Sequence, residues 1–228
     1  MRVHKYMALC GVASRRKSEI IVSEGRVEIN GQVASINSAV NENDLVKVDG
    51  KIITLEERKV YLMLNKPLAC VTTADDQFDR KTVMDYIDVK ERVYPIGRLD
   101  YNTTGMLLLT NDGDLAHKIM HPSSHLTKTY VAKIKGTPSQ EELDQFEKGL
   151  MIDEKMTSPA KIRVVRDGIV QVQIYEGRNR QVRKMLDAIG YPVINLKRIR
   201  IGKLVLDDLK LGDYRHLTED EVKYLKDY

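Results

Sequence analysis

Residues 97–122 have the sequence GRLDYNTTGMLLLTNDGDLAHKIMHP, and the order of residue types in this stretch indicates the fold around it. A loop containing glycine leads into the apolar run 106–109, which we interpret as a buried strand. The turn 111–113 follows, and we predict a short helix after it that ends at Pro122. The stretch therefore predicts a strand that leaves the core through a turn into a helix.

Strand-like and helix-like runs interleave on both sides of this stretch. Residues 60–64 are a continuous apolar run, and residues 130–134 and 169–175 predict further strands. Apolar residues at helical spacing predict helices over 139–150 and 182–189. Strands outnumber helices and hairpin signals recur, so we predict an α+β fold whose mixed, largely antiparallel sheet has flanking helices.

The first fifty residues predict a smaller α+β module. Apolar residues from Val3 to Cys10 follow one helical face, and a second helix is expected from Ser14 to Gly25. The dipeptides at 30–31 and 49–50, Asn-Gly and Asp-Gly, are typical of hairpin turns. A polar connector without an apolar pattern follows. We therefore predict an N-terminal domain over residues 1–54, a linker over 55–59 and a second domain over 60–228.

The distribution of charge is more informative than its sum. The chain has 228 residues, and 37 Lys and Arg against 33 Asp and Glu give a formal net charge of +4. Residues 178–203 nevertheless hold eight Lys and Arg against one Asp, and residues 1–31 are also rich in cations. Two basic regions far apart in the chain indicate a polyanion contacted at two places, although ordinary solvated faces are the alternative.

Several classes of protein are disfavoured by what the sequence lacks. No run approaches the length of about 20 apolar residues that a membrane span needs, and no signal peptide is recognisable, so we expect a cytoplasmic protein. Phosphate-binding and dinucleotide-binding glycine motifs are missing. His117, His121 and His125 recur every four residues, but without an acidic or Cys ligand in register. We therefore expect no metal and no cofactor, and we expect a monomer.

Two interpretations of Asp100 are open from the residues alone. Its place in a glycine loop at the end of a buried strand suits a rigidly held catalytic carboxylate, and it equally suits a turn aspartate that caps backbone NH groups. For Asp75, Asp76 and Asp79 a solvated loop is the better interpretation.

The predicted helix over 182–189 begins with cations. Arg178 and Arg180 precede it, and cations at a helix N-terminus oppose the helix dipole. An anionic ligand or a partner carboxylate would offset this cost, so we favour a binding function over a merely solvated helix end.

Three separated motifs now carry a family resemblance. The motifs GRLDYNTTG at 97–105, KTY at 128–130 and EGRNRQVR at 176–183 resemble the three active-site motifs of pseudouridine synthases, in the branch that modifies ribosomal RNA. The N-terminal module is similar to the S4 RNA-binding domain that precedes catalysis in this branch. The resemblance covers essentially the whole chain in the right order.

The resemblance implies roles that spacing alone does not supply. Asp100 matches the essential aspartate that detaches uracil from the ribose so that the base reattaches through C5. Arg183 matches the arginine that pairs with this aspartate, and Tyr130 matches the tyrosine whose ring lies against the flipped base. Arg98 resembles the residue that enters the RNA helix where the uridine leaves. The further expected substrate contacts are Thr104, Arg178 and Arg180 in the second domain, and Lys5, Arg15, Arg16, Lys17 and Arg26 in the S4-like domain.

The resemblance therefore predicts a ribosomal RNA pseudouridine synthase without cofactor. The N-terminus looks like that of members acting on the large subunit, which favours a uridine of 23S rRNA near the peptidyl-transferase region. The alternatives are the same chemistry on 16S rRNA and a non-catalytic S4-type protein of ribosome binding or assembly. Asp100, Tyr130 and Arg183 together argue against the non-catalytic alternative, because a binding protein does not need all three.

The two basic regions predict a strong dependence of RNA affinity on salt. Because each phosphate contact releases counterions, we expect affinity for an rRNA fragment to fall at least about tenfold between about 50 and 200 mM salt. Removal of one phosphate-binding cation, as in Arg15→Ala, should reduce the slope of log affinity against log salt by about one. Fluorescence anisotropy at several salt concentrations measures both effects. An affinity that stays constant over this range would contradict the prediction.

Overall fold

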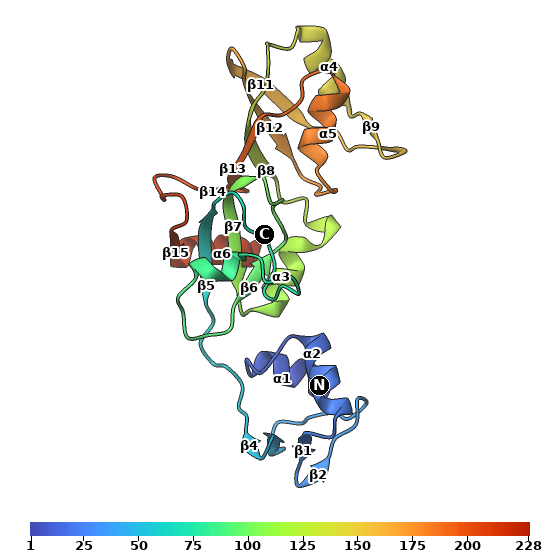
Figure 1. Cartoon of the computed structure of the whole chain (residues 1–228), viewed down its shortest axis with the longest axis vertical. Helices are drawn as coiled ribbons and strands as arrows, with labels where there is room; N and C mark the ends of the chain where they lie inside the picture. Colours follow the sequence, from blue (N-terminus) through green and yellow to red (C-terminus); the bar gives the residue numbers. More distant parts are fainter. The chain divides into compact units, whose positions relative to one another are not determined.

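The computed structural model of the chain describes residues 1–228, apart from the side chain of Pro122. The chain divides into two units, one formed by Met1–Val60 with Val89–Arg92 and the other by Tyr61–Asp88 with Val93–Tyr228. Figure 1 shows both units and labels many of their helices and strands. No helix in the described part of the chain is long and apolar enough to cross a membrane.

Two packed helices begin the first unit. They are α1 (Val3–Leu9) and α2 (Arg15–Ser23), where the apolar spacing predicts them. The α2 helix begins after Ser14, whose side chain accepts a hydrogen bond from the backbone NH of Lys17. Met7 of α1 and Val22 of α2 are buried in the core of this unit.

A small antiparallel sheet completes the first unit. Its strand order is β2-β1-β3-β4. The strands are β1 (Val27–Ile29), β2 (Gln32–Val33), β3 (Val46–Val48) and β4 (Lys51–Ile52). Two-residue turns connect β1 to β2 and β3 to β4, and Asn30, Gly31, Asp49 and Gly50 all have positive φ. This conformation matches the twist of hairpin strands, so both predicted hairpin turns are confirmed.

The second unit is built on one large sheet. Its strand order is β11-β12-β8-β13-β7-β5-β15, with β14 paired to β13 and β6 paired to β7. The strands are β5 (Tyr61–Lys66), β6 (Tyr94–Ile96), β7 (Thr104–Thr110), β8 (Lys128–Lys133), β11 (Lys161–Arg166), β12 (Ile169–Ile174), β13 (Asn195–Ile201), β14 (Leu204–Val205) and β15 (Tyr214–His216). Among the described strands of this sheet only β13 and β7 pair in parallel. The α+β fold with a mixed, largely antiparallel sheet is thus confirmed.

Helices and short segments flank the sheet. They are η1 (Val83–Tyr86), α3 (Gly113–Met120), η2 (Pro122–Ser124), α4 (Gln140–Lys148), α5 (Gln181–Ala188) and α6 (Glu219–Asp227), together with the hairpin β9 (Met151–Ile152) and β10 (Lys155–Met156). In Figure 1, α3 and α6 lie beside the half of the sheet that holds β5 and β7, whereas α4 and α5 lie beside β11 and β12. Met63 and Leu108 pack against Ile119 of α3 and Leu225 of α6, which explains why β5 and β7 are apolar.

Gly105 allows β7 and β13 to approach each other closely. Its φ is +107°, and a Cβ built on it would lie 2.1 Å from the carbonyl oxygen of Arg198 on β13. Both the backbone conformation and the space therefore require glycine at this position.

We predict that Gly105→Ala destabilises the second unit by at least about 2 kcal/mol, because positive φ costs roughly 1–2 kcal/mol and the strands must also move apart. Gly190→Ala is the matched control, since Gly190 has a φ of +88° and no atom within 4 Å of a built Cβ. Urea denaturation of both variants measures the difference. Equal losses of stability would show that the close approach of β13 is unimportant.

Candidate active site

A buried lysine holds the loop that carries Asp100. Lys66, at the end of β5, is 0% exposed, and its ammonium donates to the carbonyl oxygens of Pro67, Asp100 and Thr103, each at 3.0 Å. Burial lowers the pKa of Lys66, whereas the nearby Cys70 and Asp100 act in the opposite direction. The backbone of the Asp100 loop is therefore bound to a buried cation.

Arg183 of α5 holds the same loop from the other end. Its Nη2 donates to the carbonyl oxygen of Asn102 at 2.7 Å and to Oγ1 of Thr103 at 3.4 Å, and its Nη1 donates to the carbonyl oxygen of Val193 at 3.2 Å. Burial and the charge of Arg180 lower the pKa of Arg183, whereas Asp100 raises it. Arg183 is 8% exposed.

The expected direct pair of Arg183 and Asp100 is not formed. No ion pair within 4.0 Å joins these two side chains in the described structure, because the Arg183 guanidinium is directed to backbone carbonyl groups. Arg183 acts on Asp100 through the position of its loop and through longer-range charge. The expected pairing of Arg183 with Asp100 therefore stays a prediction.

Tyr130 lies on β8, directly opposite Arg198 of β13. Nη1 of Arg198 donates to the Tyr130 hydroxyl at 3.5 Å, and its Nε donates to the carbonyl oxygen of Met106 on β7 at 2.8 Å. The Tyr130 ring is 8% exposed, and Arg198 is 4% exposed. Nη2 of Arg198 is buried without a hydrogen-bond partner in the described residues, which is uncommon for a buried donor.

Hydrogen bonds from side chains of the loop before α5 connect this loop to neighbouring segments. The carboxylate of Glu176 accepts hydrogen bonds from the backbone and the hydroxyl of Ser158, both at 3.1 Å, and from the Gln181 side chain. Arg178 donates to the carbonyl oxygens of Lys155 and Met156, which connects this loop to the hairpin β9–β10. The motif at 176–183 therefore forms a rigid wall.

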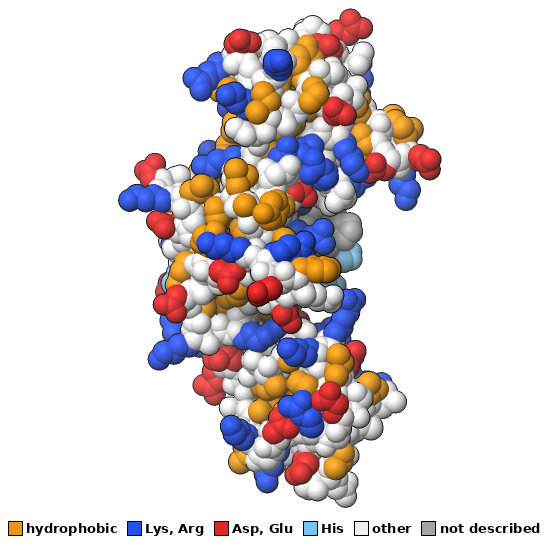
Figure 2. Space-filling view, viewed as in Figure 1, with side chains coloured by type: hydrophobic (Ala, Val, Ile, Leu, Met, Phe, Trp, Pro, Cys, Tyr) orange, Lys and Arg blue, Asp and Glu red, His pale blue; other side chains and the backbone are white. Residues whose placement is uncertain are grey.

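Many of these residues line one cavity of about 830 Å³, whereas Lys66 and Arg183 lie outside its lining. Its walls include the side chains of Arg98, Asp100, Lys128, Tyr130, Arg178, Arg180 and Arg198. Three separated motifs and β13 thus supply a carboxylate, an aromatic ring and several cations to the same cavity. In Figure 2, Lys and Arg side chains gather on the visible surface near α5.

Like Arg178, the expected substrate contacts Thr104 and Arg26 have partners within the protein. Thr104 lies on β7, and its hydroxyl donates to the carbonyl oxygen of Leu196 at 3.4 Å, so this side chain takes part in strand packing. Arg26 of the first unit forms ion pairs with Asp49 at 2.6 Å and with Glu24 at 2.9 Å. The sequence predicted RNA contacts for these two residues. Their internal partners were not foreseen, because a sequence motif does not show which internal partner a side chain has. The remaining expected cations of that unit, Lys5, Arg15, Arg16 and Lys17, are exposed on α1 and α2.

Sequence reasoning did not identify three residues of the site. Lys66 had a weak signal, a lysine at the end of a continuous apolar run, whereas Lys128 and Arg198 were noted only within a motif and a basic region. Lys128 donates to the carbonyl oxygen of Tyr175 at 3.1 Å. Burial and then the charge of Arg198 lower the pKa of Lys128 to about 8.

A family model of the RNA pseudouridylate synthases matches residues 60–188, and an S4 domain model matches residues 1–46. The chain is 46% identical to "Ribosomal large subunit pseudouridine synthase B" of Bacillus subtilis (strain 168), over 99% of this chain and 95% of the relative. It is 34% identical to "Dual-specificity RNA pseudouridine synthase RluF" of Escherichia coli (strain K12), over 97% and 77%. A solved structure described as "Crystal structure of pseudouridylate synthase" matches with a TM-score of 0.73 and 33% identity, over 99% of both chains.

The matched family and the S4 domain that precedes the catalytic unit along the chain indicate an RNA-modifying isomerase, and the cavity holds a carboxylate, a tyrosine and several cations. The chain belongs to the RNA pseudouridylate synthase family. The predicted family, the S4 domain and the isomerase class are thereby confirmed, and the enzyme is favoured over the non-catalytic alternative.

The pKa of Lys128 predicts a pH dependence of RNA binding. Because its charge is lost as the pH rises through about 8, the affinity of the wild type for RNA should fall between about pH 7 and 9. Lys128→Arg keeps its charge over this range and should show a flatter profile. Titrations by anisotropy at fixed ionic strength measure both profiles. Identical profiles for the two proteins would contradict the assignment to Lys128.

Proposed function

We propose that this enzyme converts one uridine of 23S rRNA, near the peptidyl-transferase region, to pseudouridine, with Asp100 as the catalytic carboxylate. The choice of large-subunit rRNA is supported by the 46% identity to a relative named for the large ribosomal subunit, which extends over nearly the full length of both chains.

The single observation that carries the catalytic assignment is the meeting of Asp100 and Tyr130 in one cavity. These residues are far apart in the sequence and come from two of the three motifs. The carboxylate belongs to a loop that Lys66 and Arg183 hold by its backbone, so its position does not depend on the substrate. Such preorganisation is what a reaction at one ribose carbon needs.

In the proposed reaction the bond between N1 of uracil and C1′ of the ribose breaks. The base rotates, and a bond forms between C5 and C1′. The proton on C5 is released and N1 gains a proton, so the reaction is an isomerisation without net oxidation or reduction. Attack of the carboxylate on C1′ and removal of a proton from C2′ both use the ionised form of Asp100.

The remaining residues of the cavity hold the flipped uridine. The Tyr130 ring provides an apolar face for uracil, which replaces part of the stacking that is lost when the base leaves the RNA helix. We assign to the unpartnered Nη2 of Arg198 a hydrogen bond to a carbonyl oxygen of the base, because this donor has no partner within the described residues and Arg198 lines the cavity. Arg98 and Arg180 supply positive charge for the neighbouring phosphates, and Arg98 enters the RNA helix where the uridine leaves.

The S4 domain positions the RNA through phosphate contacts. Lys5, Arg15, Arg16 and Lys17 are the cations that we assign to this role. We also propose that the enzyme is a monomer. Its rRNA substrate supports a cytoplasmic location.

Mapping of pseudouridine tests the proposal. Carbodiimide modification and primer extension are applied to rRNA from cells that lack the protein and are complemented with the wild type or Asp100→Asn. We expect one uridine of 23S rRNA to be modified with the wild type alone. A target in 16S rRNA would overturn the choice of subunit, and a map that does not change would overturn an rRNA target.

Purified Asp100→Asn separates catalysis from binding. Loss of the carboxylate should reduce turnover at least about 1000-fold while RNA affinity stays within about threefold. Asp208→Asn is the matched control, because Asp208 is exposed and lies outside the walls of the cavity. Substantial turnover of Asp100→Asn would remove Asp100 from its proposed role.

A further inference from the structure

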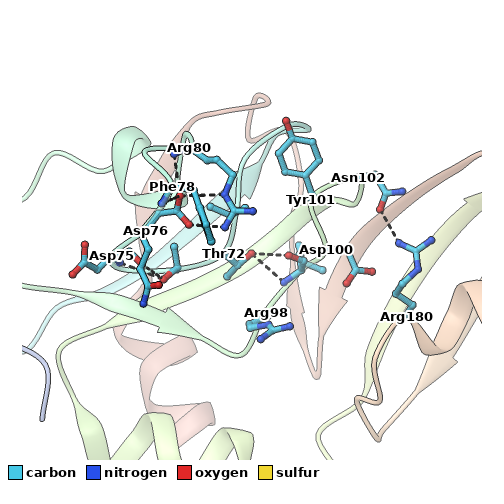
Figure 3. Close-up of a pocket in the computed structure, with 14 residues that line it drawn as sticks. Thr72, Asp75, Asp76, Phe78, Arg80, Arg98, Asp100, Tyr101, Asn102 and Arg180 are labelled. Carbon is cyan, nitrogen blue, oxygen red and sulfur yellow. Dashed lines mark hydrogen bonds and ion pairs between the residues drawn. The ribbon is translucent and has the colours of Figure 1, made fainter. Parts of the chain in front are cut away.

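A second cavity of about 660 Å³ adjoins the active site. Its walls share Arg98, Leu99, Asp100 and Arg180 with the first cavity, and Tyr101, Asn102 and residues from the loop 71–80 form the rest. Figure 3 shows Asp76, Phe78 and Arg80 on one side of this cavity and Asp100 with Arg180 on the other. The proposed mechanism makes no use of the loop 71–80.

The loop presents an aromatic ring to solvent. Phe78 is 73% exposed, whereas Phe146, the other phenylalanine of the chain, is completely buried. Tyr101 lines the same cavity and is 54% exposed. The Arg80 guanidinium lies 4.9 Å from the centre of the Phe78 ring. Two exposed rings beside a cation are the groups on which unpaired bases stack in proteins that bind single-stranded RNA.

Asp76 holds this arrangement in place. Its carboxylate accepts hydrogen bonds from the backbone NH groups of Phe78 at 3.1 Å and Arg80 at 2.9 Å, and from Nη2 of Arg80 at 2.7 Å on its other oxygen. The Asp76 side chain is 7% exposed, and the contacts with Arg80 hold its pKa well below the usual range. The expectation of a solvated loop is therefore wrong for Asp76, which is an internal anchor.

This anchoring lowers the cost of binding. Asp76 holds the backbone of the loop that carries Phe78, so this backbone need not be ordered when a ligand arrives. The ligand that fits is the base of a nucleotide, because the cavity offers aromatic faces for stacking and Arg98 and Arg180 for an adjacent phosphate.

The shared wall relates this base to the reaction. RNA is continuous, so a nucleotide next to the flipped uridine must lie close to Asp100, where the two cavities meet. We propose that the second cavity binds the base of a nucleotide adjacent to the target uridine, stacked on Phe78. The inference rests on the proposed function, which places the uridine in the first cavity.

Kinetics provide the first test. The substrates are in vitro transcripts of 16S and 23S rRNA with tritium at C5 of uridine, because formation of the new bond at C5 releases this label. Loss of one stacked base should lower kcat/KM of Phe78→Ala between about 5-fold and 150-fold, mainly through KM. Phe78→Tyr keeps a ring and should restore it. Val165→Ala is the control, since Val165 is 50% exposed on β11 and should leave kcat/KM unchanged.

Fluorescence provides the second test, which does not depend on turnover. The chain contains no tryptophan, so Phe78→Trp introduces a single reporter into the cavity. We expect the unlabelled transcript to quench this fluorescence by stacking. Val165→Trp is the matched single-tryptophan control and should not be quenched.

The outcomes separate the inference from the function. If the wild type releases tritium, the proposed function holds. The second base site is then overturned if Phe78→Ala has unaltered kinetics, or if the transcript does not quench the fluorescence of Phe78→Trp. If the wild type releases no tritium from either transcript, the proposed function fails, and quenching of Phe78→Trp alone then decides whether a base binds beside Phe78.

Discussion

The candidate active site depends on the hydrogen bonds between the buried ammonium group of Lys66 and the backbone carbonyl groups near it. A buried cation is costly unless hydrogen bonds compensate for lost water, and the backbone carbonyl groups of Pro67, Asp100 and Thr103 supply these bonds. The loop cannot change shape without leaving this charge without partners. Arg183 adds a second buried cation on the neighbouring peptide groups. The two cations thus fix a backbone whose carboxylate side chain faces the cavity.

The register of strands β8, β13 and β7 positions the residues on the other side of the cavity. Arg198 is hydrogen-bonded to the backbone of β7 and contacts Tyr130 on β8, so one side chain on β13 spans three neighbouring strands. The close approach of β7 and β13 at Gly105 makes this geometry attainable. The tyrosine ring and the Asp100 loop are consequently held by the same sheet, and the distance between them is set by packing in the core. A preorganised site of this kind suits catalysis on a base that has left its helix.

Much of the fold could be predicted because its signals are local. Ser14 at the start of α2, the Asn-Gly turn at 30–31 and the apolar run at 106–109 determine their own backbone through caps, positive φ and burial. The internal partner of a charged side chain has no such local signal when it lies far away in the sequence. Asp76 is an anchor for Arg80, and Arg26 is paired with Asp49, although both residues were predicted to face solvent or RNA. The environment of a charged side chain depends on residues far away in the sequence.

The sequence was sufficient to identify the family and the S4 domain and to propose Asp100, Tyr130 and Arg183 as site residues, because motifs with specific residue types and order carry that information. The contacts of these residues became visible only in the folded structure. It placed Lys66 beneath the Asp100 loop, directed Arg183 to backbone carbonyl groups and brought Arg198 to Tyr130. It also joined a second cavity to the first at Asp100. The physical reason is that burial and hydrogen-bond partners arise from long-range packing, which the spacing of residues along the chain does not specify.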